Sequence, residues 1–239
     1  MGCACEKRRD DDHREETFKL LEEADLRGIA EQAVAIPEAT NRAVRHLEKA
    51  ERAERLSLGN DVAALYRQAA DRDRAQGIRN YRAVLARIDE RTGRADWREL
   101  ADRTRQAFEE RDGTALVDEA RGRMRLAALD MDGVSADDAE AAVAIFDESL
   151  DRLVADGLDG AVSLLRERLE RGLSTLESPT MGRQLASPIT QNQTICIGIV
   201  SGVAVIEAII CAATEFCWCC WGWVIIAQLA IGILICLAS

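Results

Sequence analysis

Apolar side chains recur at intervals of three and four residues along most of the chain between residues 15 and 180. This spacing places them on one face of an α-helix, whereas a half-buried β-strand would alternate apolar and polar residues. Clear stripes are Val62, Leu65, Tyr66, Ala69; Ala142, Val143, Phe146, Leu150, Leu153; and Val162, Leu165, Leu169, Leu173. Residues that end or interrupt helices stand between the stripes, at Pro37, Gly59, Gly77, Gly93, Gly113, Gly133, Gly157 and Gly160. The pattern therefore predicts roughly seven or eight helices of about 10 to 20 residues each.

A helix with a single apolar stripe must bury that stripe against a neighbour. For residues 15–180 we therefore expect an all-α fold, either an antiparallel helical bundle or stacked helical hairpins. Residues 1–14 are strongly charged and are predicted to form a disordered N-terminus. Residues 181–194 are interpreted as a polar linker, and residues 195–239 as an apolar segment that forms a C-terminal helical hairpin.

Charge divides the chain into two unlike parts. All 31 cations and 40 of the 42 acids precede residue 184, so 31 minus 40 gives these residues a net charge of −9, out of −11 for the whole chain. A net acidic chain without a basic block lacks the surface that binds phosphates, and no nucleic acid partner is expected. The excess of acid, with 28 Arg against 3 Lys, is typical of a salt-adapted organism or of a GC-rich genome.

One acidic segment resembles catalytic and metal-binding loops. Asp130-Met131-Asp132-Gly133 resembles the nucleophile loop of haloacid-dehalogenase phosphatases, and its carboxylates also suggest a calcium loop. The phosphatase loop must follow a buried strand and needs a later Lys, whereas the pattern here is helical and Lys49 is the last lysine. The segment is therefore interpreted as an acidic loop between helices, and the sequence predicts no catalytic, metal or cofactor site and no enzyme.

The segment 195–239 is built differently from the rest of the chain. Of its 45 residues, 35 are apolar. A bilayer core takes about 20 helical residues, so the segment is too long for one span and predicts two, at 195–213 and 224–237. Gly198 and Gly202 would let the two helices approach closely. By default the helical domain then stays in the cytoplasm.

Polar and aromatic residues of this segment refine the prediction. Glu207 falls near the middle of the first span, where a carboxylate is expected to be protonated or to pair with Gln228 of the second. Tryptophan prefers the boundary between lipid and water, and three occur in the joint between the spans, Trp218, Trp221 and Trp223. The lipid bilayer is therefore an expected partner.

Six of the eight cysteines lie in the same segment, at Cys196, Cys211, Cys217, Cys219, Cys220 and Cys236. As reduced residues they would be small, buried apolar side chains. In an oxidising compartment they could instead form three disulfides, with 15 possible connectivities. Their even number, in the part that would leave the cytoplasm, favours the disulfides.

The residues 205–217, with Ile195-Cys196-Ile197-Gly198 upstream, resemble the Cys-rich apolar peptides of the small (microhalocin-type) halocins, antimicrobial peptides of haloarchaea. The order of the chain is also similar to that of halocin precursors, in which an acidic N-terminal part serves as the immunity protein. The resemblance implies that the C-terminal peptide is released by cleavage, within residues 184–194, and acts outside the cell.

Two non-enzymatic hypotheses follow. In the first, the chain is a precursor whose acidic helical domain is a partner or immunity domain for a C-terminal, Cys-rich, membrane-active peptide. In the second, it is an intact membrane protein whose cytoplasmic helical domain binds another protein and is anchored by the C-terminal hairpin. The cysteine density favours the first.

Overall fold

The computed structural model describes residues 19, 25–110, 114, 117–118, 121–122, 125–126, 136–178 and 197–198. Within this part of the chain the regular secondary structure is helical and contains no strand, which confirms the all-α prediction. The principal helices are α2 (Leu26–Arg55), α3 (Asn60–Arg91), α4 (Ala95–Glu110) and α6 (Ala136–Glu177). The predicted N-terminal segment and linker, and all of the predicted apolar hairpin except Ile197 and Gly198, lie outside the described residues.

The helices are longer than the sequence predicted. α2 and α3 contain 30 and 32 residues, because Pro37 and Gly77 lie inside these helices and do not end them; Gly160 likewise lies inside α6. The prediction of helices of about 10 to 20 residues is therefore wrong for α2 and α3. Local penalties of about 1 kcal/mol for glycine and about 3 kcal/mol for proline are outweighed by packing against neighbouring helices. At Gly77 an added Cβ atom would lie 3.0 Å from Leu176 Cδ1, so α6 packs closely against α3 at this glycine.

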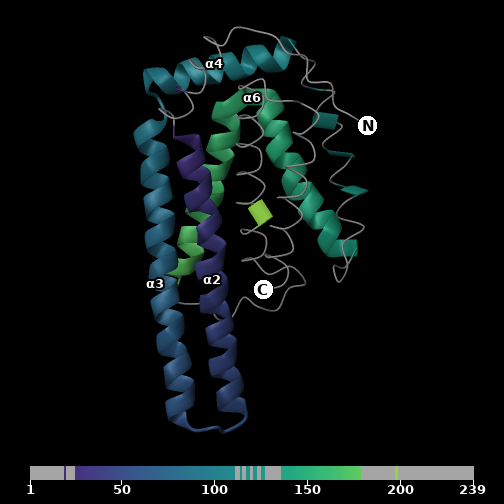
Figure 1. Cartoon of the computed structure of the whole chain (residues 1–239). Helices are drawn as coiled ribbons and strands as arrows, with labels where there is room; N and C mark the ends of the chain where they lie inside the picture. The colour runs from purple at the N-terminus through teal and green to yellow at the C-terminus, as the bar shows by residue number, and fades with distance from the viewer. Residues whose placement is uncertain are drawn as a thin grey trace, which may run out of the picture.

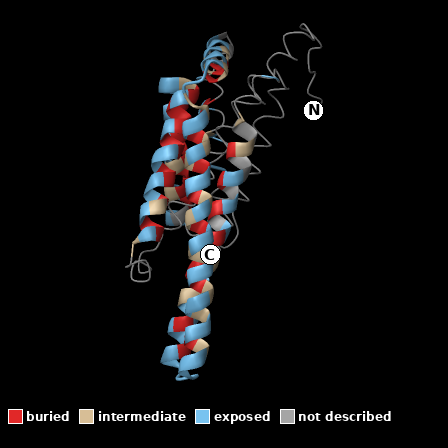
Figure 2. Ribbon diagram, turned by 90° about the vertical axis from the view of Figure 1, so that its left-hand side faces the viewer, coloured by how far each residue is buried: buried red, intermediate tan, exposed pale blue. Residues whose placement is uncertain are grey.

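Helices α2 and α3 form a long antiparallel hairpin (Figure 1). The turn that joins them spans residues 56–59, and Gly59 at its end has φ 104°, a backbone conformation that favours glycine. Their facing sides carry the buried residues coloured in Figure 2. Toward the turn these are alanines, Ala50, Ala53, Ala63 and Ala70, whereas the other end of the hairpin buries Ile29, Ile36, Tyr81, Val84 and Ile88. The large side chains of the hairpin core are thus concentrated away from the turn.

Helix α6 changes direction at Gly157, whose backbone angles, φ 64° and ψ −146°, are not helical. The predicted interruption at Gly157 is confirmed as this kink. We refer to residues 136–156 as the N-terminal arm and to residues 158–177 as the C-terminal arm; Figure 1 shows the two arms diverging from the bend. The C-terminal arm packs against α3, and α4 also contacts α6.

Helix α3 and the C-terminal arm approach each other closely where Tyr81 meets Gly172. Tyr81 is buried, and a Cβ atom added at Gly172 would overlap its ring and hydroxyl oxygen. Burial raises the pKa of Tyr81, because ionisation would leave a charge in the core, and the hydrogen bond with Thr40 opposes this effect. Tyr81 is therefore neutral, and its ring and hydroxyl oxygen lie directly against the arm at Gly172.

Helix α4 crosses the end of the molecule at the α6 bend (Figure 1). Trp97 is buried, and its Nε1–H donates a hydrogen bond to Asp159 Oδ1 at 2.7 Å. Asp159 follows the kink at Gly157 by two residues. This hydrogen bond therefore joins α4 to the start of the C-terminal arm.

The C-terminal end of α6 is held by an arginine from α3. Arg74 Nε donates to the carbonyl oxygen of Leu176 at 2.5 Å, and Arg74 Nη2 donates to that of Ser178 at 3.2 Å. The last carbonyls of a helix have no partner within the helix, and a cation there also interacts favourably with the helix dipole. Arg74 therefore stabilises the end of the arm and its attachment to α3.

Replacing this arginine tests that role. We expect Arg74→Gln to lower the free energy of unfolding by about 1 kcal/mol, because two carbonyls lose a charged donor. Arg72→Gln is the matched control, since Arg72 is exposed on the same helix. Urea unfolding of the full chain in detergent, followed by circular dichroism, measures both. Equal effects of the two substitutions would show that the loss of positive charge, and not the capping, is responsible.

Candidate functional site

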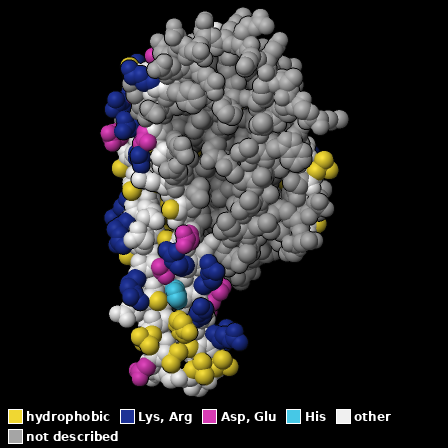
Figure 3. Space-filling view, in the orientation of Figure 1, with side chains coloured by type: hydrophobic (Ala, Val, Ile, Leu, Met, Phe, Trp, Pro, Cys, Tyr) yellow, Lys and Arg dark blue, Asp and Glu magenta, His cyan; other side chains and the backbone are white. Residues whose placement is uncertain are grey.

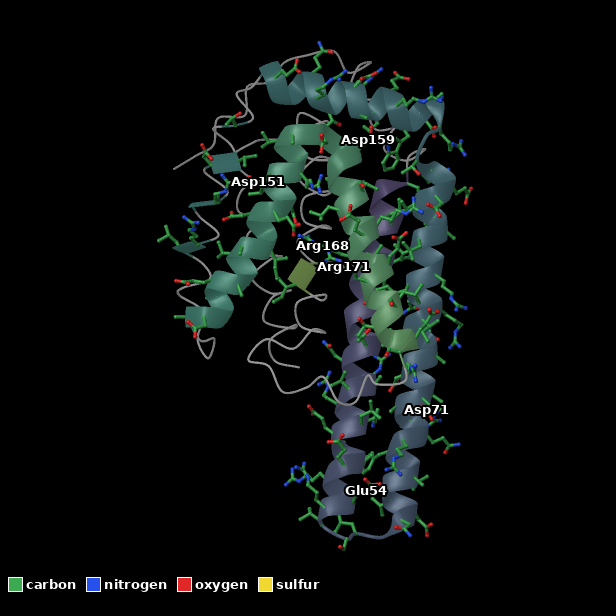
Figure 4. All side chains as sticks on the ribbon, turned by 180° about the vertical axis from the view of Figure 1, so that it is seen from behind. Glu54, Asp71, Asp151, Asp159, Arg168 and Arg171 are labelled. Carbon is green, nitrogen blue, oxygen red and sulfur yellow. The ribbon has the colours of Figure 1, made fainter. Side chains whose placement is uncertain are left out.

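A buried cation lies on the C-terminal arm of α6. Arg168 is only 4% exposed, although it belongs to a residue type that is normally found at the surface. It falls on the apolar face of the arm, between the buried residues Leu165 and Leu169. In Figure 4 Arg168 lies on the arm opposite the one that carries Asp151. Its guanidinium group reaches from the C-terminal arm to the N-terminal arm.

Arg168 makes four hydrogen bonds. Nη1 donates to Ser149 Oγ at 2.7 Å and to the carbonyl oxygen of Gly198 at 2.9 Å. Nη2 donates to the carbonyl oxygen of Ile145 at 3.0 Å and to Glu148 Oε2 at 2.8 Å. Three of these partners come from the N-terminal arm of α6, and the fourth comes from the beginning of the apolar segment. One side chain thus links both arms to the apolar segment.

Burial lowers the pKa of Arg168, because a charged group loses its hydration. The hydrogen bond and the charge of Glu148 oppose that shift. Glu148 remains about half exposed, with a side-chain exposure of 53%, so its carboxylate keeps much of its own hydration. An arginine stays protonated under ordinary conditions, and its fork of N–H donors is suited to bind several oxygens at once. The site is therefore a fixed positive charge directed at backbone and carboxylate oxygens.

The two described residues of the apolar segment are buried at this site. Ile197 is 0% exposed, and Gly198 is also buried. A Cβ atom at residue 198 would lie 2.9 Å from Arg168 Cδ and 3.2 Å from its Nε. Glycine therefore allows the backbone to approach the arginine closely enough for the hydrogen bond at its carbonyl.

The structure thus gives Gly198 a contact that the sequence did not predict. We expected Gly198 and Gly202 to bring two apolar helices together, but Gly198 lies against Arg168 of the helical domain. Gly202 lies outside the described residues. The predicted disulfide, intramembrane and interface residues also lie outside them, namely Cys196, Cys211, Cys217, Cys219, Cys220, Cys236, Glu207, Gln228, Trp218, Trp221 and Trp223.

Sequence reasoning did not identify Arg168. A signal was present, because an arginine at this position interrupts an otherwise apolar helical face. In a chain with 28 arginines, however, a single one does not stand out. Only the burial of its side chain distinguishes it from the solvated arginines around it.

Beside Arg168 the same arm borders an open hollow of about 390 Å³, lined by Glu167, Glu170, Arg171 and Ser174. These residues supply carboxylates, a cation and a hydroxyl, but they do not include a histidine or thiol that could form a nucleophile and base pair. Among the described residues no group of three His, Cys, Asp or Glu side chains is placed to hold a metal ion. The Asp130–Asp132 loop lies outside the described residues.

No known family model, curated protein or solved structure matches this chain. Within the described residues, no helix is both long enough and apolar enough to cross a membrane. A functional assignment must therefore be argued from the residues and contacts of the chain itself.

Proposed function

We propose that this chain is a non-enzymatic precursor. In this proposal, the acidic helical domain of residues 15–180 binds and shields the Cys-rich apolar segment 195–239. Once released, that segment acts on lipid bilayers as an antimicrobial-type peptide. The observation that supports the proposal is the burial of Ile197 and Gly198, together with the hydrogen bond from the buried Arg168 of α6 to Gly198.

The chemistry of this contact supports a partner domain. An anchored cytoplasmic domain needs no contact with its anchor, and burying a charge is costly unless it is well paired. Here the charge is paired partly with the apolar segment itself, through a backbone carbonyl. Such a contact would hold the beginning of the peptide whether the bond in the linker is intact or cleaved.

The cysteines and the resemblance to halocin precursors support the same proposal. In those precursors the acidic N-terminal part confers immunity, which is the role we assign to the helical domain. We propose that the domain stays in the cytoplasm, that the peptide is released to the medium, and that Cys196, Cys211, Cys217, Cys219, Cys220 and Cys236 form disulfides there. No metal, cofactor or nucleic acid takes part.

Mass spectrometry of the culture medium and of the membranes tests release. The expected result is a C-terminal fragment that begins within residues 184–194 and is lighter by about two mass units for each disulfide. If the membranes hold only the full-length chain with free thiols, and the medium holds no fragment, the alternative is correct: an intact membrane protein with a hairpin anchor.

A growth assay tests the partner role. Cells that express the helical domain, residues 1–183, should survive exposure to the released peptide, whereas cells that express the Arg168→Met form should lose much of that protection. Arg171→Met is the control, because Arg171 lies one turn away on the same arm but is exposed. Equal protection by all three forms at equal protein levels would contradict a partner role for the Arg168 site.

A further inference from the structure

The free end of the α2–α3 hairpin exposes large apolar side chains. We call residues 52–67 the hairpin tip; it comprises the end of α2, the turn and the beginning of α3. Leu56 and Leu58 are each 57% exposed, and Leu65 is 65% exposed. Figure 3 shows hydrophobic side chains gathered at this end of the molecule, with basic side chains beside them.

The sequence of the hairpin explains why these leucines stay outside. The helices meet near the turn through Ala50, Ala53 and Ala63, and small residues bring two helices close together. The interface therefore leaves little room for a leucine. Ser57 adopts φ 52°, and this left-handed residue lies between Leu56 and Leu58 in the turn. The tip is thus built to present leucines at its end.

The net charge of the tip is opposite in sign to the net charge of the whole protein. Residues 52–67 hold three cations and two acids, which gives +1 in a chain whose net charge is −11. Glu54 already pairs with Arg67. Arg52 and Arg55, in the last turn of α2, are exposed and have no acidic partner among the described residues. Two arginines available to bind anions therefore adjoin the exposed leucines.

We propose that the hairpin tip docks on an anionic lipid surface, with Leu56, Leu58 and Leu65 in the interfacial region and Arg52 and Arg55 on the headgroup phosphates. Leucines with adjacent arginines are the combination that binds the surface of an anionic bilayer. A second copy of the chain fits less well, because three leucine side chains expose far less than the roughly 800 Å² per partner of a stable interface. The proposal does not depend on release of the C-terminal peptide.

Hydrogen–deuterium exchange of the full chain provides a local test, read by mass spectrometry with vesicles of phosphatidylcholine alone or mixed with phosphatidylglycerol. The informative amides are those of residues 59–61 at the N-terminus of α3, where no side chain caps the helix. We expect their exchange to slow with phosphatidylglycerol vesicles, but not with phosphatidylcholine vesicles or with inorganic phosphate. The local readout separates the tip from any binding by residues 195–239.

Two double variants should abolish that slowing, Leu56→Ser with Leu58→Ser, and Arg52→Gln with Arg55→Gln. Leu126→Ser is the matched control, since Leu126 is 72% exposed and lies outside the tip. All of these positions are exposed, so an unchanged circular dichroism melting curve is expected for each variant. Exchange that is the same with and without anionic vesicles would overturn the proposal. Amide exchange that becomes slower at higher protein concentration without lipid would also overturn it, because a second copy of the chain would then cover the tip.

Discussion

Arg168→Met is expected to weaken the contact between the apolar segment and α6 by about 2 kcal/mol, or roughly thirtyfold. Methionine fills a similar volume but donates no hydrogen bond, so the carbonyl of Gly198 loses its partner in a buried place. Part of the loss is offset, because the variant no longer buries a charge. Hydrogen exchange of a peptide that covers residues 197–198 measures the effect directly, and we expect faster exchange there.

Two further variants separate geometry from charge. Arg168→Lys keeps the positive charge but cannot reach three oxygens of the N-terminal arm and the carbonyl oxygen of Gly198 at once, so most of the effect should persist. Arg171→Met removes an exposed charge from the same arm and should leave exchange at residues 197–198 unchanged. If Arg171→Met accelerated exchange as much as Arg168→Met, the contact would depend on the net charge of the arm and not on a specific site.

Gly198→Ala tests the same contact by changing the other partner. The new Cβ atom would lie 2.9 Å from Arg168 Cδ, and the arginine, held by four hydrogen bonds, has little freedom to move away. If the two residues act through one contact, combining Gly198→Ala with Arg168→Met should change exchange little more than either substitution alone. Additive effects would mean that the two residues act independently.

The repeat of apolar residues predicted the helices of the described chain because it follows directly from helical geometry. It predicted the breaks at Gly59, Gly93 and Gly157, but it also predicted one at Gly77, which lies inside α3, because glycine serves different purposes at different positions. Gly157 is a kink with positive φ, whereas Gly77 lies within a continuous helix where Leu176 approaches. These glycines differ only in their neighbours in the fold, which a single sequence does not reveal.

The site was less predictable than the fold for a related reason. The sequence identified the apolar segment and singled out Gly198 as a residue of close approach, but it did not predict Arg168 as a neighbour of Gly198. Arg168 has no local signature beyond its position on an apolar face. Its role depends on Ser149, Glu148 and Ile145, which lie about 20 residues earlier in the chain and come close only because α6 bends at Gly157.

The position of the C-terminal arm, and hence of Arg168, depends on the fit of Tyr81 against Gly172. We expect Gly172→Ala to lower the free energy of unfolding by about 2 kcal/mol. Overpacking a buried contact costs about 3 kcal/mol at the upper end of its usual range, and the better helix propensity of alanine returns about 1 kcal/mol. The clash is with the ring of a buried tyrosine and cannot be relieved by rotating an exposed side chain.

The same substitution at Gly122 should have the opposite sign. Gly122 is also helical, but it is exposed, and an added Cβ atom would meet nothing within 4 Å. Gly122→Ala should therefore stabilise the chain by up to about 1 kcal/mol through helix propensity alone. Urea unfolding measures the stability of both variants. If Gly172→Ala stabilised the chain, Tyr81 would not occupy the space next to residue 172.

A double-mutant cycle tests whether Tyr81 causes the loss of stability in Gly172→Ala. Tyr81→Leu removes the ring and its hydroxyl, so Gly172→Ala made in that background should cost at least about 1 kcal/mol less than in the original chain. Because Arg168 lies one helical turn before Gly172, the clash should also tilt the arm and accelerate exchange at residues 197–198. If Gly172→Ala destabilises the chain without changing that exchange, Arg168 is positioned by the N-terminal arm of α6 and not by the packing on α3.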